Sequence, residues 1–446
     1  MARREENIVL FPFMAQGHII PFMALALQLE QRTNYSVTIV NTPLNIKKLR
    51  SSLPPSSSIH LFELPFNSSD HGLPPNTENT DILPYNLVLR LLESSTSVRP
   101  SFKQLVQKLI DTQLGHGQAR VCIIADLFFG WTASVAKELG VFHAFFSLTS
   151  VYGLACYYSF WMNLPYKKEN SDEFSFPDFP EANRIHKSQL PRYMLEADGA
   201  DAWTVFQTKN FSEWVHTDGI LSNSVEEFDQ LGLQYFRRKF GRKVWTIGPV
   251  LSTGSRERAG REYGIGPELC REWLNTKPLS SVLYVSFGSM NTISPSQMMQ
   301  LAMALEESGT NFIWVVRPPI GFDINSEFKD NEWFPEGFQE RIQGHGVPIL
   351  GWPIAAEQFF NSKLLEEEVG VSVEVARGKS SEVRHEDIAA KIELVMDETQ
   401  KGKEMKRKAC EVRDIIKIAM KDEEGFQGSS AKGMNDFLST LVSVKE

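Results

Sequence analysis

The first half of the chain alternates short, wholly apolar runs with longer stretches in which apolar residues recur at helical spacing. Runs that are apolar at every position are typical of parallel strands buried on both faces, with helices covering those faces. The pattern predicts a Rossmann-like α/β domain with a doubly wound parallel sheet. Its seven expected strands are Ile8–Phe13, Val37–Val40, Ile59–Leu64, Val121–Ala125, His143–Ser147, Gly219–Ser222 and Val244–Ile247.

A change of composition follows Gly248 and Pro249, where residues 251–267 combine several glycines with Arg and Glu and predict a linker. The strand–helix alternation then resumes. We expect an N-terminal domain of residues 1–250 and a C-terminal domain of residues 268–446, facing across a ligand cleft, with a last helix that packs back on the first domain. Four strands are expected in the second domain, which is a small sheet for the helices that follow. These strands are Val282–Phe287, Phe312–Val316, Val347–Leu350 and Val371–Val375.

Residues 141–166 contain no Lys, Arg, Asp or Glu and are numerous enough to span a bilayer. Ser, Thr and Gly interrupt the stretch, so a buried strand followed by an aromatic-rich helix explains it better than a membrane span. The charged N-terminus lacks the order of a secretory signal peptide. We therefore expect a soluble, cytoplasmic protein with no stable membrane insertion.

Composition narrows the function classes. The chain has 46 Lys and Arg against 55 Asp and Glu, and no basic block large enough for a nucleic-acid-binding face. Its four cysteines form no C-x-x-C pair and no disulfide framework, which fits a reducing compartment. The nine histidines are dispersed, so no metal site is predicted. The signatures of P-loop, zinc-protease, α/β-hydrolase and ordinary dinucleotide-binding proteins are missing.

Candidate chemistry lies where predicted strands end. His18 follows the first strand and opens the next helix, and a neutral imidazole there can accept a proton from a bound hydroxyl. Asp126 follows the fourth strand, where a carboxylate can hold that histidine in one tautomer and stabilise its protonated form. Each has a simpler alternative, a helix-start histidine bonded to backbone and a helix N-cap aspartate. Considered as a pair, they favour the functional interpretation.

The second half offers two further candidates. The turn Ser286-Phe-Gly-Ser289 ends its first strand and presents backbone N–H groups and a hydroxyl suited to a phosphate, although many such turns bind nothing. Glu357 and Gln358 follow an apolar strand, and a neighbouring carboxylate and amide suit sugar hydroxyls. Their alternative role is to open a solvated helix.

Together these motifs resemble the plant family 1 UDP-glycosyltransferases. The matching segments, which run along nearly the whole chain, are Pro12-Phe-x-x-x-Gly-His18, Asp126 before Phe128-x-x-Trp131, Trp245-x-Ile-Gly-Pro249, Val285-Ser-Phe-Gly-Ser289, Phe312-Ile-Trp-Val-Val-Arg317, Phe334-Pro-Glu-Gly-Phe338, and His345-Gly-Val-Pro348 through Glu357-Gln358.

The resemblance implies a GT-B fold of two Rossmann-like domains and an inverting transfer, from UDP-glucose by preference, to a hydroxyl of a small apolar acceptor. It implies that His18 is the general base and Asp126 its partner, that Ser289 contacts phosphate, and that Glu357 and Gln358 contact the donor sugar. It further implies a monomer that needs no cofactor or metal. Aromatic residues could wall the acceptor pocket or belong to the core, among them Phe128, Trp131 and Tyr157.

The chain departs from the family pattern in the donor-binding signature. The family's Trp-Ala-Pro-Gln and His-Cys-Gly-Trp-Asn-Ser segments are missing, and roughly 40 residues, room for about two strand–helix units, are expected to be absent between Gln343 and Gly344. The alternative function is therefore an impaired or inactive variant that retains at most small-molecule or protein binding. We also expect a loosely packed second domain.

Overall fold

The computed structural model describes residues 6–114, 120–168, 171–251, 267–278, 281–288, 291–318, 350–379, 381–396 and 399–443. The chain divides into two compact units. Unit 1 comprises Met1–Ile185, Glu196–Gly260 and Ile415–Glu446, and unit 2 comprises His186–Leu195 and Arg261–Asp414. Most of the predicted linker and the Gln343–Gly344 junction lie outside the described residues.

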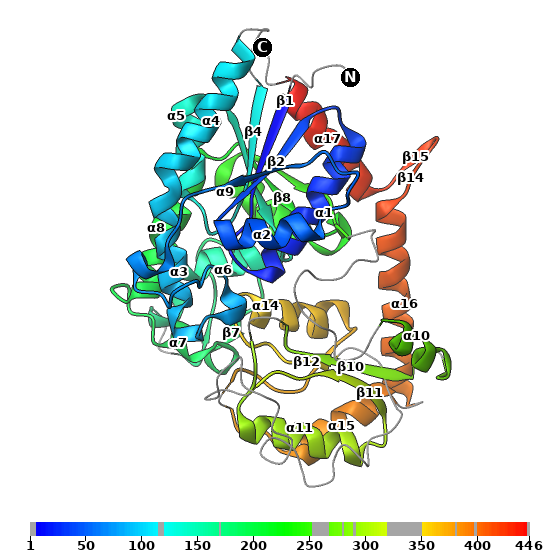
Figure 1. Cartoon of the computed structure of the whole chain (residues 1–446). Coiled ribbons are helices and arrows are strands. Elements are labelled where there is room, and N and C mark those ends of the chain that lie inside the picture. The colour runs from blue at the N-terminus through cyan, green and yellow to red at the C-terminus, as the bar shows by residue number, and fades with distance from the viewer. Residues whose placement is uncertain are drawn as a thin grey trace. The chain divides into compact units, whose positions relative to one another are not determined.

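Unit 1 is built on a seven-stranded parallel sheet of order β3-β2-β1-β4-β5-β8-β9 (Figure 1). Each strand matches one of the seven apolar runs, so the prediction of a doubly wound α/β domain is confirmed. The chain first builds outward from β1 to β3 and then starts again on the other side of β1 with β4. The strands are β1 (Glu6–Phe11), β2 (Ser36–Asn41), β3 (His60–Glu63), β4 (Arg120–Asp126), β5 (Phe142–Ser147), β8 (Gly219–Ser222) and β9 (Lys243–Thr246).

Both faces of this sheet are covered because successive side chains of a strand point to opposite faces. On one face Ile8 and Leu10 belong to a core shared with helices α1, α2 and α17. On the other, Phe11 packs against Phe102 of α4 and Trp131 of α5. The helices of unit 1 are α1 (Gln16–Arg32), α2 (Pro43–Ser52), α3 (Val88–Ser94), α4 (Arg99–Leu114), α5 (Trp131–Leu139), α6 (Val151–Asn163), α8 (Ala202–Ser212), α9 (Gln230–Phe240) and α17 (Ser429–Ser443).

The C-terminal helix α17, red in Figure 1, packs on this sheet. Phe437 contacts the Trp245 ring at 5.3 Å, and Asp436 accepts hydrogen bonds from the Trp245 indole (2.7 Å) and from Lys243 (2.8 Å). Gly433 permits the close approach, since a Cβ there would lie 2.1 Å from the Thr246 carbonyl oxygen. Residues at the end of the chain therefore complete a core begun by its first strand.

Unit 2 has its four described strands in two separate parallel pairs, β10–β11 and β12–β13. A cavity of about 370 Å³ is lined by both pairs and by α11 and α15, including Leu283, Leu301, Leu350, Val375, Ile388 and Ile392. The elements are β10 (Val282–Ser286), β11 (Asn311–Val315), β12 (Leu350–Gly351), β13 (Val373–Glu374), α7 (Arg192–Leu195), α10 (Pro267–Asn275), α11 (Pro295–Glu307), α14 (Gln358–Lys363) and α15 (His385–Met396).

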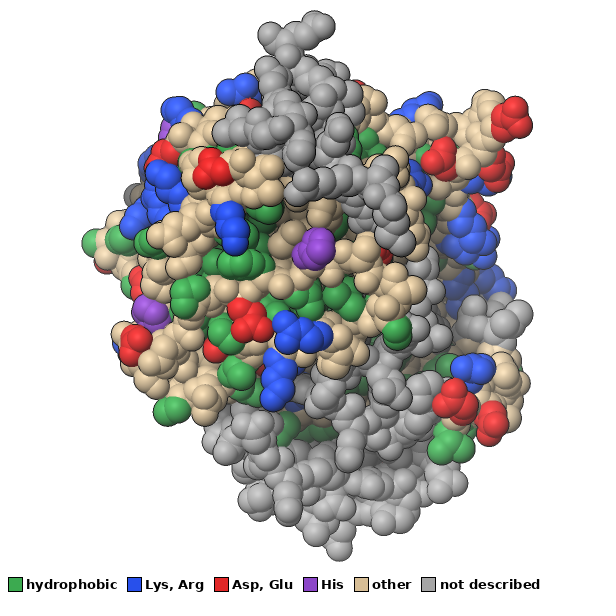
Figure 2. Space-filling model, turned by 45° about the horizontal axis from the view of Figure 1, so that its top comes forward, with side chains coloured by type: hydrophobic (Ala, Val, Ile, Leu, Met, Phe, Trp, Pro, Cys, Tyr) green, Lys and Arg blue, Asp and Glu red, His purple; other side chains and the backbone are tan. Residues whose placement is uncertain are grey.

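Helix α16 (Gln400–Met420) crosses the division between the units. Four strands of two residues were not predicted, and they form the short pairs β6 (Glu173–Phe174) with β7 (Ile185–His186) and β14 (Asp422–Glu423) with β15 (Phe426–Gln427). Figure 2 shows charges of both signs across the visible face, with Lys and Arg most concentrated along α16. There Arg407 pairs with Glu404 and Glu411, so the cluster is partly neutralised.

The uncharged stretch of residues 141–166 forms strand β5 and helix α6, as the interrupted pattern predicted. Helix α6 has 13 residues and begins where the Ser150 side chain accepts a hydrogen bond from Gly153 N–H. Within the described part of the chain, no helix combines the length and the apolar character needed to cross a membrane.

Candidate active site

His18 and Asp126 lie in contact, although 108 residues separate them in the chain. His18 lies in the first turn of α1, directly after β1, and Asp126 is the last residue of β4. Strands β1 and β4 are neighbours, and between them the strand order reverses. At such a switch point the carboxyl ends of two adjacent strands face a common crevice, where doubly wound sheets bind ligands.

The contact joins His18 Nδ1 to an Asp126 carboxylate oxygen at 2.6 Å. Asp126 is 1% exposed, whereas the His18 side chain is 26% exposed. Because an ionised carboxylate only accepts, His18 Nδ1–H donates and the unprotonated nitrogen is Nε2. The pair therefore presents a basic nitrogen held in one tautomer, an arrangement that can take a proton and stabilise the resulting imidazolium.

The simpler alternative for Asp126 does not hold. Helix α5 begins at Trp131 with Gly130 as its N-cap residue. The second carboxylate oxygen of Asp126 instead accepts from the backbone N–H of Phe128 at 3.2 Å, which closes a short turn after β4. This bond fixes the carboxylate orientation toward His18.

Of the three predicted acceptor-pocket residues, Phe128 lies beside the pair, with ring centroids 5.7 Å from His18 and 5.5 Å from Phe13. Trp131 and Tyr157 are buried among other rings, Trp131 against Phe102 and Tyr157 against Phe211. Phe13, which the sequence did not single out, also packs edge-on against His18 at 5.4 Å. Phe13 and Phe128 thus form an apolar wall next to the polar pair.

The candidates of the second half lie in unit 2. Ser289 is outside the described residues; its neighbour Gly288 has a positive φ of 77°, as the predicted tight turn requires. Glu357 is the N-cap residue of α14 and is half-buried. The Gln358 side-chain oxygen accepts from the backbone N–H groups of Ile354 (2.9 Å) and Ala355 (3.2 Å). These two bonds use the oxygen of the Gln358 amide and not its nitrogen.

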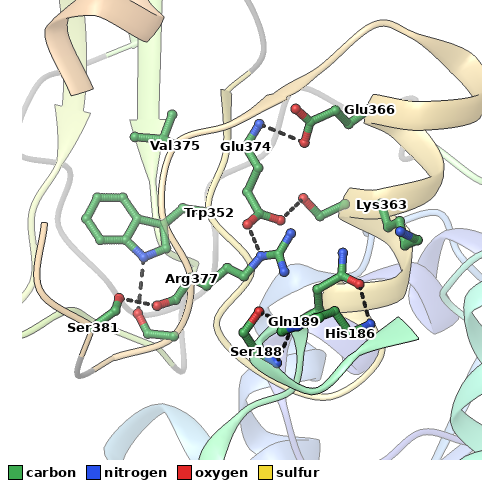
Figure 3. A network of polar contacts seen from close by, with 12 residues as sticks. His186, Ser188, Gln189, Trp352, Lys363, Glu366, Glu374, Val375, Arg377 and Ser381 are labelled. Carbon is green, nitrogen blue, oxygen red and sulfur yellow. Dashed lines mark hydrogen bonds and ion pairs between the residues drawn. The ribbon is translucent and has the colours of Figure 1, made fainter. Parts of the chain in front are cut away.

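A polar network lies beside these residues (Figure 3). The Trp352 indole donates to the Gly378 carbonyl at 3.1 Å, and the Glu374 carboxylate accepts from Ser362 at 2.8 Å and from Arg377. Ser286, Gly288, Trp352 and Gln358 line the cavity of unit 2 together with Asn291, whose buried side-chain oxygen has no hydrogen-bond partner among the described residues. Of the predicted donor-side residues only Glu357 and Gln358 are described, and Gln358 lines the same cavity as Ser286 and Gly288 at the end of β10.

Unit 1 is a doubly wound α/β unit with a histidine–aspartate pair at its switch point, and comparison with known proteins identifies the family to which the chain belongs. No protein-family model matches the chain. UDP-glycosyltransferase 92A1 of Arabidopsis thaliana is 49% identical over 487 aligned positions that cover 99% of this chain and 98% of the relative. Crocetin glucosyltransferase 3 of Crocus sativus is 36% identical, over 97% of this chain and 98% of the relative.

Among solved structures, UGT73P12 of Glycyrrhiza uralensis, complexed with glycyrrhetinic acid 3-O-monoglucuronide, superposes with a TM-score of 0.78 at 24% identity. The superposition covers 99% of this chain and 96% of that structure. The chain belongs to the plant UDP-glycosyltransferases and has their GT-B fold.

Two residues that the sequence analysis missed form hydrogen bonds with the backbone next to the site. Asn41 at the end of β2 and Asn210 of α8 bond to the loops that carry His18 and Asp126. A signal for the first was available, because Asn41 and Thr42 directly follow an apolar strand. Asn210 lies 80 residues beyond Gly130 of the loop to which it bonds, and no motif near Asn210 indicated this role.

Proposed function

We propose that this chain transfers a sugar, glucose by preference, from a UDP-sugar to a hydroxyl of a small apolar acceptor, with inversion at the anomeric carbon. The observation that carries the proposal is the 2.6 Å contact of His18 with buried Asp126 at the switch point of the sheet. The family membership supports the use of a UDP-sugar, and the Crocus relative, which is named a glucosyltransferase, supports glucose.

In the proposed reaction His18 Nε2 takes the proton of the acceptor hydroxyl while the acceptor oxygen forms a bond to the anomeric carbon. The bond from that carbon to the diphosphate oxygen breaks, and its electron pair leaves with UDP. Asp126 stabilises the imidazolium that forms, because the two groups are in contact and the carboxylate is shielded from water. The half-buried ring of Phe128 lies where it can contact an apolar acceptor, and the buried ring of Phe13 packs against both Phe128 and His18.

On the donor side we propose that Glu357 and Gln358 contact the sugar hydroxyls and that Ser289 contacts phosphate. The half-buried position of Glu357 and the location of Gln358 at the cavity edge support the first assignment. We also propose that protein donors carry the diphosphate charge, so that no metal is required. The monomeric state and the cytoplasmic location stay predictions.

The test is turnover of UDP-glucose with a panel of phenols, with UDP release and the glucoside measured together. His18→Ala and Asp126→Asn should each lower kcat by about 10² or more, since each removes general-base catalysis or its tautomer control. His60→Ala is the control, because His60 is an exposed histidine of β3. Undiminished turnover by His18→Ala would refute the role of His18.

The missing donor segment is a second proposal. The alignment with the Arabidopsis relative spans 487 positions, 41 more than the 446 residues of the chain, which supports an internal gap of about the proposed size. The division of the unit 2 strands into two pairs with a cavity between them also supports it. The comparisons do not favour the alternative of a non-catalytic variant, and calorimetry with UDP-glucose decides the question. Micromolar binding by the full chain would reject the alternative, whereas absence of binding would support it.

A further inference from the structure

The distance between His18 and Asp126 depends on two short loops. Residues 12–15 connect β1 to α1 and place His18, and residues 127–130 connect β4 to α5 and follow Asp126. A 2.6 Å hydrogen bond tolerates little relative movement, since a few tenths of an ångström weaken it. Whatever holds both loops therefore also sets the geometry of the pair.

The first loop and the first residue of α1 form hydrogen bonds with neighbouring segments at Pro12, Met14 and Gln16. The Asn41 side-chain amide donates to the Pro12 carbonyl at 2.9 Å, and the backbone N–H of Thr80 donates to the Met14 carbonyl at 3.0 Å. The Gln16 amide donates to the Asp81 carboxylate at 3.4 Å. His18 follows two residues after Gln16, so the hydrogen bonds at Pro12, Met14 and Gln16 fix the backbone that leads to it.

Asn41 is fully buried at the end of β2, the strand adjacent to β1. Its side-chain oxygen accepts from the backbone N–H of Thr42 at 2.9 Å, so both halves of its amide are used. The segment that carries Thr80 is fixed in turn by buried amides, because Asn79 donates to the Asn45 side chain at 2.8 Å and Asn45 donates to the Glu78 carbonyl at 2.7 Å. Both groups that hold the first loop, the Asn41 amide and the Thr80 backbone, are therefore fixed by further hydrogen bonds.

The second loop has a matching clamp. Asn210 of α8 is 6% exposed, its amide nitrogen donates to the Leu127 carbonyl at 2.9 Å, and its side-chain oxygen accepts from the Gly130 backbone N–H at 2.8 Å. The two bonds span the loop from end to end. Glycine is required at position 130 because a Cβ there would lie 2.3 Å from the Asn210 carbonyl oxygen.

We propose that Asn41 and Asn210 are positioning residues that hold the His18–Asp126 hydrogen bond from opposite sides. Neither asparagine contacts the reacting atoms; each uses a buried amide to hold the backbone of one loop. The inference rests on the proposed role of His18, but it concerns a hydrogen bond that can be observed without turnover. Asn41→Ala leaves the Pro12 carbonyl without its side-chain donor, and Asn210→Ala leaves the Gly130 N–H without its acceptor, whereas the Leu127 carbonyl keeps the bond from the Trp214 indole at 3.3 Å. A buried group that loses its partner moves to find another.

The experiment uses the full chain labelled with ¹⁵N-histidine, and the His18 signals are assigned by their loss in His18→Gln. In the unsubstituted chain, His18 should show a protonated Nδ1, an unprotonated Nε2 and a slowly exchanging Nδ1–H. Asn41→Ala and Asn210→Ala should each populate both tautomers and speed Nδ1–H exchange with water at least tenfold. Where turnover is measurable, kcat should fall at least tenfold while the acceptor KM stays within threefold.

Asn163→Ala is the matched control, since Asn163 of α6 also donates its amide to a backbone carbonyl, that of Ser159, at 3.0 Å. It should leave the His18 signals unchanged. If an alanine variant lacks a cooperative melt, Asn41→Asp or Asn210→Asp replaces it, because Asp keeps an accepting oxygen and replaces the donating amide nitrogen by a charged, accepting oxygen. His18 signals that stay unchanged in folded variants at both positions would overturn the inference. A normal hydrogen-bond signature without any turnover would instead count against the proposed function alone.

Discussion

Unit 2 should unfold before unit 1 when the full chain is heated or exposed to protease. The cavity between its two strand pairs has a volume of about 370 Å³ and is lined largely by apolar residues. Each 100 Å² of apolar surface that such an open arrangement leaves in contact with water costs about 2.5 kcal/mol, a sizeable share of the roughly 5–15 kcal/mol of a whole domain. Side chains of the separated strands are also exposed to solvent, with Tyr284 of β10 62% exposed and Val315 of β11 44% exposed.

Two measurements test this prediction. Differential scanning calorimetry of the full chain should show two transitions, the lower one from unit 2. Limited proteolysis with thermolysin should cut within unit 2 well before it cuts between Ile8 and Ile247. Because Asp436 and Phe437 attach α17 to the sheet of unit 1, the C-terminal fragment should copurify with that resistant core after cleavage.

The control is a chimera that carries, between Gln343 and Gly344, the residues of the Arabidopsis relative that have no counterpart here. If missing strands cause the weakness, the insertion should raise the lower transition and slow the cleavage of unit 2. One cooperative melt for the unmodified chain, with uniform protease resistance, would show that the separated strand pairs cost unit 2 little stability and would refute the reasoning.

Three further predictions concern metal, pH and the C-terminal helix. EDTA should leave turnover of UDP-glucose unchanged, because protein donors are proposed to carry the diphosphate charge. Burial lowers the pKa of His143 from 6.5 to about 3, so between these pH values the unfolded chain binds more protons than the folded chain. The stability that is present above pH 6.5 is therefore lost as the pH falls toward 3. His143→Gln should therefore reduce the loss of unfolding free energy between pH 7 and pH 4 by about 3 kcal/mol, measured by denaturant titration. Asp436→Ala should destabilise unit 1 by about 1 kcal/mol through its lost bonds to Lys243 and Trp245, measured by tryptophan fluorescence during melting.

Much of unit 1 could be predicted from local patterns. Wholly apolar runs such as Val121–Ala125 can be buried on both faces only as interior strands, so their positions follow from the residues alone. The same logic separated β5 from α6 within an uncharged stretch. It also located both His18 and Asp126, because each polar side chain directly follows such a run at the strand end where ligands bind.

The order of strands in the sheet was decided only by the tertiary structure. Periodicity shows which segments are strands but not which strands are neighbours. The family resemblance implied that Asp126 is the partner of His18, and the adjacency of β1 and β4 shows how the two side chains come into contact. The roles of Asn41 and Asn210 depend in the same way on loops that are distant in sequence.

The C-terminal helix illustrates the same division. The sequence by itself indicates a last helix, because the C-terminal residues are rich in Lys, Glu and Ala, which favour that conformation. That α17 completes the core around Trp245, and that Gly433 must lack a side chain to do so, follows from packing between segments about 190 residues apart. Local propensity selects the elements of this protein, and complementary shape and hydrogen bonding between distant segments select their partners.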